Sequence, residues 1–296
     1  MTDRTVTTAV LPVAGVGTRF LPATKAIPKE AIPIVDRPAL QYVVEECAAA
    51  GISDVLLVTA RGKEALADHF DRAPELESVL AAKGRDDLLD EVVRLANLVE
   101  VHTVRQPEAL GLGHAVLMAR GHVGNRSFAV ALGDDFPGPN ETLLADMIKA
   151  HEETGRAVVA LMEVPHDQIH LYGNVAVTET DRPGVFDVHE LIEKPDPADA
   201  PSDLAIIGRY VLPGEAFDVL AETPPGRGGE IQLTDALATL ASDEPILGVR
   251  LDGKRYDVGD KLGYLKATVE LALERDDLGH EFRTWLTDLM ASEDDR

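Results

Sequence analysis

The sequence predicts an α/β fold with a mixed, mainly parallel central sheet and helices on both of its faces. Short continuous runs of apolar and β-branched residues recur along the chain, which is the pattern of strands buried on both faces. Stretches with helical periodicity separate these runs in the first half, and such alternation favours parallel strands. Hydrophobic residues make up 45% of the 296 residues, enough for one large core.

The first half alternates strands with helices. A helix is expected over Pro38–Ala50, with a proline at its start and Gly51 at its stop. The predicted buried strands are Thr7–Val13, Val55–Thr59, Val99–Val104 and Phe128–Leu132. The other predicted helices are Glu64–Phe70, Leu76–Lys83, Asp87–Ala96 and His114–Arg120.

The second half is more mixed, and no internal repeat or linker marks a domain boundary. We therefore expect a single domain over residues 1–275 and a charged helical tail over residues 276–296. The tail contains the only tryptophan, Trp285, and is either a solvated helix or a docking helix for a neighbouring subunit. Predicted strands are Ala157–Val164, Asn174–Thr178, Val185–Ile192 and Ala205–Val211. Predicted helices are Leu143–Glu153, Glu215–Ala221, Ile231–Ala241 and Leu262–Glu274.

The chain is strongly acidic, with 28 Lys plus Arg against 52 Asp plus Glu and a formal net charge of −24. Nucleic acids and anionic membranes bind through clustered basic residues, so we expect neither as a partner. No apolar signal region opens the sequence and no run approaches the ~20 apolar residues of a membrane span, which predicts a cytoplasmic location. The single cysteine, Cys47, excludes an internal disulfide and a multi-cysteine zinc site.

A glycine-containing turn follows the first predicted strand directly, in the run Leu11–Arg19. Glycines let the backbone turn tightly and bring its N–H groups against an anion, and Arg19 can bind phosphate oxygens through two parallel hydrogen bonds. The same pattern also fits an ordinary strand-to-loop turn. Basic residues are enriched around it: residues 1–37 contain Arg4, Arg19, Lys25, Lys29 and Arg37 against Asp3, Glu30 and Asp36.

Two familiar phosphate-binding motifs do not fit this turn. A Walker loop requires Gly-Lys-Ser/Thr at a spacing that is absent after Gly15. A dinucleotide fingerprint requires a third glycine, where this chain has Phe20, and then a helix. The prolines within Leu21–Val35 exclude that helix and predict an extended loop over the strand ends. Because the loop carries Lys25 and Lys29, it suits a triphosphate better than a hydride carrier.

Carboxylates follow strand-like runs at two places. Asp134 stands with Asp135 after Phe128–Leu132, and Asp257 follows a later run, so that both would lie where a sheet of this class holds Mg²⁺. Either one alone could simply cap a turn. Glu193 and Lys194 close another strand and suit a phosphosugar, with a plain surface ion pair as the alternative. Together with the basic loop, these groups suggest metal-assisted nucleotidyl transfer.

With these motifs in place, the chain closely resembles bacterial UTP–glucose-1-phosphate uridylyltransferases, within the wider sugar nucleotidyltransferase family. The resemblance spans about Val10 to Glu274, in order and at family-like spacing. It implies a Rossmann-like nucleotidyltransferase fold, a homodimer or homotetramer, and uridylyl transfer from UTP to glucose 1-phosphate with release of pyrophosphate. The matching stretches are Ala14–Arg19, Leu21–Glu30, Gly111–Ala115, Tyr172-Gly173, Glu193–Pro195, Gly208–Tyr210 and Gly229–Asp235.

The resemblance also implies roles for individual residues. Asp134 and Asp257 would coordinate Mg²⁺, and the substrate supplies its own ionised nucleophile, so that His114 is not expected to act as a base. The uracil and ribose would lie against Ala14, Gly15, Gln106 and Gly111. The UTP phosphates would meet Arg19 and Lys29, and glucose 1-phosphate would meet Gly173, Glu193 and Lys194.

Three residues depart from the family pattern: Gly133, where proline is more usual in uridylyltransferases, Asn174 and Asp260. Of these, only Gly133 bears on nucleotide choice, and it favours dTTP, whereas the Lys25–Glu30 stretch favours UTP more strongly. A thymidylyltransferase is therefore one alternative. A non-catalytic UDP-sugar sensor on the same fold and a glycosyltransferase are two others.

Overall fold

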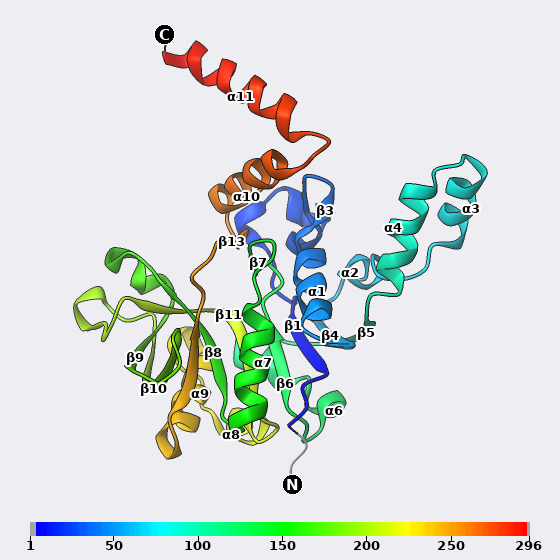
Figure 1. The fold of residues 1–296 in the computed structure, drawn as a ribbon. Helices are drawn as coiled ribbons and strands as arrows, with labels where there is room; N and C mark the ends of the chain where they lie inside the picture. Colours follow the sequence, from blue (N-terminus) through cyan, green and yellow to red (C-terminus); the bar gives the residue numbers. More distant parts are fainter. Residues whose placement is uncertain (1–3, 295–296) are drawn as a thin grey trace.

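The computed structural model describes residues 4–294, and its centre is a nine-stranded mixed sheet with helices on both faces (Figure 1). The strand order is β5-β4-β1-β6-β11-β8-β12-β10-β9. These strands are β1 (Thr8–Pro12), β4 (Asp54–Thr59), β5 (Glu100–Arg105), β6 (Phe128–Ala131), β8 (Val158–Glu163), β9 (Gly173–Glu179), β10 (Val185–Glu193), β11 (Leu204–Leu212) and β12 (Ile246–Arg250). Two small ladders pair β2 (Pro33–Ile34) with β3 (Arg37–Pro38) and β7 (Asp135–Pro137) with β13 (Arg255–Asp257).

The mixed sheet confirms the predicted fold class: of its nine strands, only β11 and β10 run opposite to the other seven. Parallel pairs join β5, β4, β1 and β6, as the strand–helix alternation of the first half predicts. β11 then runs antiparallel to both β6 and β8, and β10 runs antiparallel to both β12 and β9. The parallel pair of β8 and β12 lies between β11 and β10.

Helices cover the two faces of the sheet with separate apolar clusters. One face packs against α1, α7 and α10, represented by Val43, Met147 and Ala267. The other packs against α5, α8 and α9, where the Phe128 and Phe217 rings stack with centroids 4.6 Å apart. The α-helices are α1 (Ala39–Ala49), α2 (Ala65–Asp68), α3 (Pro74–Ala82), α4 (Asp86–Ala96), α5 (Leu112–Leu117), α6 (Arg120–Val123), α7 (Leu143–Thr154), α8 (Ala216–Glu222), α9 (Leu233–Asp243), α10 (Lys261–Glu274) and α11 (Gly279–Asp294).

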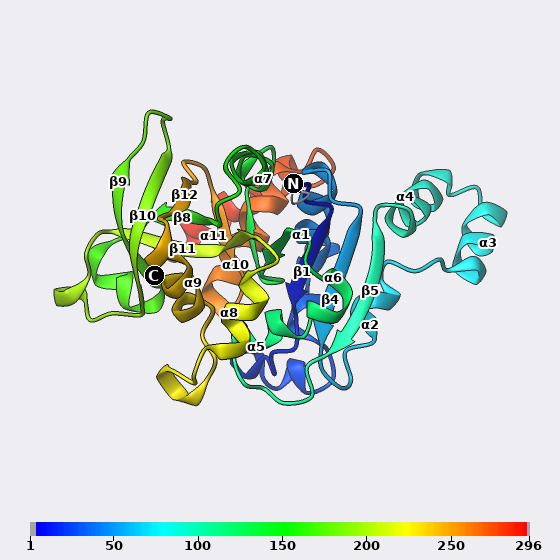
Figure 2. The same cartoon turned by 90° about the horizontal axis from the view of Figure 1, so that it is seen from below.

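Three predictions from the sequence need correction. The run Val99–Val104 forms β5, but this strand is not buried: it lies at the sheet edge, opposite β9, and residues such as Glu100 and Thr103 are exposed (Figure 2). The predicted helix His114–Arg120 is divided between α5 and α6. The strand-like run before Asp257 has no bounds among the predicted strands, yet Ile246–Arg250 forms β12 inside the sheet between β8 and β10.

The C-terminal helix α11 projects from the body of the molecule beyond α10 (Figure 1). Its aromatic pair, Phe282 and Trp285, stacks at 5.6 Å, and Trp285 is 54% exposed. Leu289 and Met290 are exposed on the same helix. Within residues 4–294, no helix has both the length and the apolar character needed to cross a membrane.

Candidate active site

A polar cavity of about 320 Å³ lies where β1, β6 and β10 end, and it gathers residues from both halves of the chain. Acidic and basic residues both line it. Of the predicted site residues, the cavity is lined by Arg19, Asp134, Gly173, Glu193, Lys194 and Asp257.

The loop after β1 has the extended form that its prolines predict. It is built from three short 3-10 turns, at Thr18–Phe20, Ala23–Lys25 and Lys29–Ala31. Gly17 has a φ of 68°, a left-handed conformation that favours glycine, and its carbonyl accepts a 2.7 Å hydrogen bond from Thr24 Oγ1. These contacts fold the loop back on itself, so that Lys29 returns to the end of β1.

Lys29 does not line the cavity but forms an ion pair with Asp134, which does. Burial disfavours the ammonium charge, but the carboxylates of Asp134 and Glu30 outweigh that cost and hold the pKa of Lys29 above its ordinary value. Lys29 therefore remains charged at neutral pH. An ammonium held in this way sits beside the region that a polyphosphate would occupy.

Behind this pair lies a buried residue that the sequence reasoning missed. Lys63 donates to Glu30 Oε2 at 2.9 Å and also to the backbone carbonyl of Val13. Burial raises the pKa of Glu30, while Lys63 and Lys29 oppose that rise. The contact ties the β4–α2 connection to the glycine loop, and only the positions of strand ends in space, not any spacing in sequence, could have revealed it.

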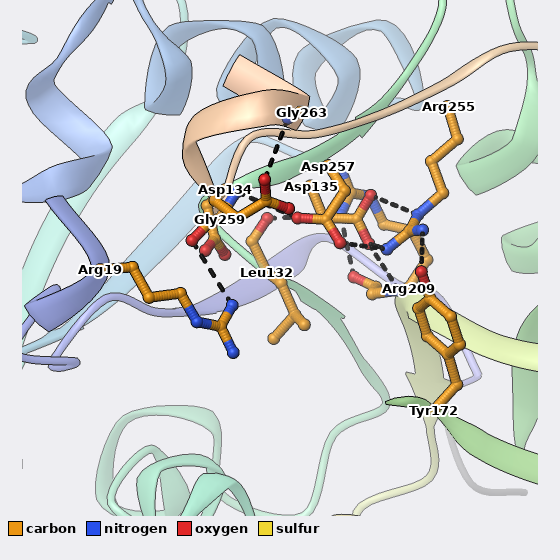
Figure 3. A network of polar contacts seen from close by, with 12 residues as sticks. Arg19, Leu132, Asp134, Asp135, Tyr172, Arg209, Arg255, Asp257, Gly259 and Gly263 are labelled. Carbon is orange, nitrogen blue, oxygen red and sulfur yellow. Dashed lines mark hydrogen bonds and ion pairs between the residues drawn. The ribbon is translucent and has the colours of Figure 1, made fainter. Parts of the chain in front are cut away.

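Asp134 and Asp257 approach each other across Gly259 (Figure 3). A Cβ atom on Gly259 would lie 2.8 Å from Asp134 Oδ2 and 3.0 Å from Asp257 Oδ1, so that only glycine leaves the space between the two carboxylates open. Burial raises the pKa of Asp257; the Arg255 guanidinium opposes the rise, and the neighbouring carboxylates of Asp135 and Asp134 add to it. Two facing carboxylates offer the oxygen ligands that a hard divalent cation prefers.

Asp135 and Arg255 form a buried ion pair next to Asp257. The Arg255 guanidinium donates to both oxygens of Asp135, at 2.8 and 2.9 Å, and to Asp257 Oδ2 at 3.2 Å (Figure 3). Asp135 Oδ2 also accepts from the Gly208 backbone N–H at 3.0 Å. Neither residue was predicted as part of the site. The sequence shows Asp134 and Asp135 side by side, but not that Arg255 pairs with Asp135 and leaves Asp134 to face Asp257.

The opposite wall of the cavity carries the residues expected to meet a sugar phosphate. Glu193 Oε2 accepts from Thr234 Oγ1 at 2.7 Å, and Glu193 Oε1 lies 3.2 Å from Lys194 Nζ. Lys194 has a φ of 48°, an uncommon left-handed conformation for a lysine, at the point where β10 ends. A Cβ on Gly173 would lie 3.2 Å from Thr234 Oγ1, so this glycine keeps the wall close to the carboxylate.

The residues expected to hold the base lie beside the cavity rather than in its lining. Gln106 Nε2 donates to the Gly111 carbonyl at 3.1 Å and lies 3.0 Å from His114 Nδ1. Gly111 has a φ of 102° and packs so closely on Ile231 that a Cβ would approach its carbonyl to 2.7 Å. Ala14 and Gly15 are likewise not among the residues that line the cavity, and Gly15 lies against the side chain of Lys29.

Each of the three residues that depart from the family pattern has a structural role, in packing or in hydrogen bonding. A Cβ on Gly133 would lie 2.7 Å from Val13 Cγ1, which means that this position faces the packed interior and not the cavity. Asn174 is fully buried and donates to the carbonyls of Ser202 and Leu204 at 2.9 and 2.8 Å. Asp260 caps α10 by accepting from the N–H groups of Leu262 and Gly263.

Comparisons with known proteins agree with this geometry. The family described as nucleotidyl transferase matches residues 8–274. A UTP–glucose-1-phosphate uridylyltransferase of Staphylococcus haemolyticus is 46% identical, over 95% of this chain and 97% of its own. The YngB uridylyltransferase of Bacillus subtilis is also 46% identical, over 96% of each chain.

Solved structures of the same kind superpose closely. A UTP-bound UDP-glucose pyrophosphorylase of Acinetobacter baumannii is 43% identical with a TM-score of 0.89, covering 96% of this chain and 99% of that one. A UDP-glucose pyrophosphorylase in complex with UDP-glucose is 38% identical with a TM-score of 0.84, covering 91% and 100%. The chain therefore belongs to the nucleotidyl transferase family, in the group of bacterial UTP–glucose-1-phosphate uridylyltransferases.

Proposed function

We propose that the protein transfers the uridylyl group of UTP to glucose 1-phosphate, giving UDP-glucose and pyrophosphate. One observation carries this proposal: Arg19, the facing carboxylates of Asp134 and Asp257, and the Glu193–Lys194 pair all line one cavity. A site for a polyphosphate and a site for a phosphosugar are thus joined through a pair of carboxylates. The relatives at 46% identity carry this activity in their names.

The chemistry requires positioning and charge neutralisation more than acid–base catalysis. A phosphate oxygen of glucose 1-phosphate, already ionised at neutral pH, attacks the α-phosphorus of UTP in line, and the bond from that phosphorus to the pyrophosphate oxygen breaks. Lys29 and Arg19 neutralise the charge of the triphosphate. Lys194 holds the attacking phosphate, while Glu193 accepts hydrogen bonds from sugar hydroxyls.

Nucleotidyltransferases of this kind generally use a divalent metal ion. We propose Mg²⁺, held by Asp134 and Asp257 in the space that Gly259 leaves open. When bound, it neutralises negative charge on the phosphates around the reacting phosphorus. Arg255, itself paired with Asp135, would hold the carboxylate of Asp257 in place, and Lys29 would hold that of Asp134.

We also propose where the nucleoside of UTP binds, how the chains assemble and where in the cell the enzyme acts. The uracil and ribose lie against the turn at Ala14 and Gly15 and the loop stabilised by Gln106 and Gly111. Residues 1–275 act as a single domain, and the tail over 276–296, described as far as residue 294 and helical over Gly279–Asp294, exposes Trp285, which suits a homodimer or homotetramer contact. We place the enzyme in the cytoplasm, where nucleoside triphosphates are made.

Pyrophosphate release tests the proposal directly. The assay contains Mg²⁺ and glucose 1-phosphate, and compares UTP, dTTP, ATP and GTP at equal concentration. We expect strong release with UTP. A preference for dTTP would keep the mechanism and replace the nucleotide. Absence of release with every nucleotide, from protein whose circular dichroism shows it to be folded, would refute the transferase and favour a UDP-sugar sensor.

A further inference from the structure

A cluster of potential metal ligands lies at the opposite end of the sheet from the cavity. It consists of Asp54, the first residue of β4, His102 on β5 and His122 on α6. One ligand atom from each residue lies within 4.8 Å of the other two. Within residues 4–294, it is the one group of three or more His, Cys, Asp or Glu residues that meets this criterion.

The sheet register explains why these residues meet. Asp54 pairs with Glu100, and Leu56 pairs with His102, across the parallel ladder of β4 and β5. Since alternate residues share a face, Asp54 and His102 point to the same side of the sheet. That side is covered by the helices after β5, and α6 brings His122 over it, as Figure 2 shows for α6 beside β4 and β5.

The contacts of Asp54 resemble those of a prepared ligand. His122 Nε2 lies 2.9 Å from Asp54 Oδ2, and His102 Nε2 lies 3.8 Å from Asp54 Oδ1. Thr8 Oγ1 donates to Asp54 Oδ2 at 2.8 Å, an outer contact of the type that orients metal-binding carboxylates. The two imidazole rings are 4.9 Å apart between centroids and tilted by 49° rather than stacked.

We propose that Asp54, His102 and His122 bind a divalent transition-metal ion of the zinc type. Two imidazoles and one carboxylate are ligands that suit Zn²⁺ and leave a fourth position for water, whereas Mg²⁺ prefers oxygen ligands alone. Tetrahedral coordination at about 2.0–2.1 Å requires ligand atoms about 3.4 Å apart. His102 must move inward to reach this spacing, and its side chain, 48% exposed, has room to do so.

Charge favours a cation here. Glu100, directly opposite Asp54 in the ladder, adds a second carboxylate on the same face, and the whole chain carries a formal net charge of −24. A bound ion would connect the edge strand β5 and its neighbour β4 to α6. It would therefore stabilise an edge that is otherwise exposed, at a distance from the catalytic carboxylates.

The test is zinc binding by tag-free protein, measured by isothermal titration calorimetry with excess Mg²⁺ to occupy the oxygen ligands of the cavity. We expect one Zn²⁺ per chain and a thermal midpoint raised by about 4 °C at a hundredfold excess over Kd. His102→Ala and His122→Ala should each weaken binding at least tenfold. His166→Ala is the matched control. His166 also contacts an aspartate, Asp203, at 2.7 Å, but within the described residues it is not part of a group of three potential metal ligands.

The outcomes separate clearly. His102 is half exposed at a sheet edge, so His102→Ala should fold and melt like the parent without metal. Loss of zinc binding in His102→Ala with retention in His166→Ala supports the site. Equal binding by both variants, or no binding by the parent chain, would overturn it. The readout does not depend on catalytic activity, so the proposal stands or fails separately from the proposed function.

Discussion

The two ends of the central sheet use polar residues in different ways. At the carboxyl ends of β1 and β6, charged groups such as Lys29, Asp134 and Arg255 are drawn together while partly or fully withdrawn from water. At the amino end of β6, His151 lies fully buried and neutral, with one ring nitrogen 2.8 Å from Ser127 Oγ and the other 2.7 Å from the Arg156 carbonyl.

The difference lies in whether the buried polar groups are charged or neutral. Around the cavity, charges that are costly to bury lie where irregular loops leave the strands, and Lys29, Asp134 and Arg255 are each held by a partner of opposite sign. At the amino end of β6, the neutral hydrogen bonds of His151 close the strand–helix junction. We therefore expect changes at the carboxyl ends to affect turnover most, and changes at the amino ends to affect stability alone.

Asp134→Ala tests this expectation with the largest effect. The change removes a carboxylate that faces Asp257 and neutralises Lys29. We expect kcat/KM to fall at least 1,000-fold, about 4 kcal/mol of transition-state stabilisation, with little change in the thermal midpoint. Asp252→Ala, at a side chain that is 70% exposed and outside the cavity, is the control and should remain active. Near-normal turnover of Asp134→Ala would refute the metal assignment.

Arg255→Met should lower both turnover and stability, because Arg255 contacts Asp257 of the site and the buried Asp135. Asp135, 5% exposed, would lose the guanidinium that contacts both of its oxygens. Leaving a buried carboxylate without its partner costs about 3–5 kcal/mol in free energy of unfolding, measurable by urea denaturation.

Two further variants show whether the buried charge is the cause. Lys254→Met removes an exposed cation next in sequence and should change stability by no more than about 0.5 kcal/mol. Adding Asp135→Asn to Arg255→Met should recover part of the loss, since an amide needs no counter-charge. A stability loss that Asp135→Asn leaves unchanged would point to packing and not to charge.

His151→Gln probes the amino end and should have the smallest effect. Burial lowers the pKa of His151 below its ordinary value of 6.5, so the folded state binds fewer protons than the unfolded state as pH falls through 6.5. The stability that the neutral imidazole contributes is therefore present above pH 6.5 and is lost below it. Glutamine does not titrate, and its amide can replace only part of the two hydrogen bonds.

We expect the variant to be about 1–2 kcal/mol less stable than the parent at pH 7.5, and this difference to shrink at pH 5.5. Urea denaturation at the two pH values measures it. Turnover at pH 7.5 should be unchanged, because His151 lies at the opposite end of β6 from the cavity. A pH-independent difference would mean that His151 contributes through shape alone.

Much of the first half was predictable from the sequence because its signals are local. The apolar run around Val10, the proline start of α1 and the prolines of Leu21–Val35 act through neighbouring residues, and the structure has the strand, helix and loop they predict. β5 was predicted as a strand but not as an edge, since burial depends on which strands lie beside it. β12 was left without bounds as a strand because a short apolar run has no period that separates strand from helix.

The sequence by itself determined the kinds of groups available: a glycine turn with Arg19 and Lys29, carboxylates after two strand-like runs, and the Glu193–Lys194 pair. Only the tertiary structure decided which of them meet. Asp134 and Asp257 face each other because β7 and β13 pair as a small ladder, with Asp135 opposite Asp257, and because Gly259 leaves the space between them open. Residues 120 positions apart, such as Asp135 and Arg255, come into contact through strand order, which no local pattern encodes.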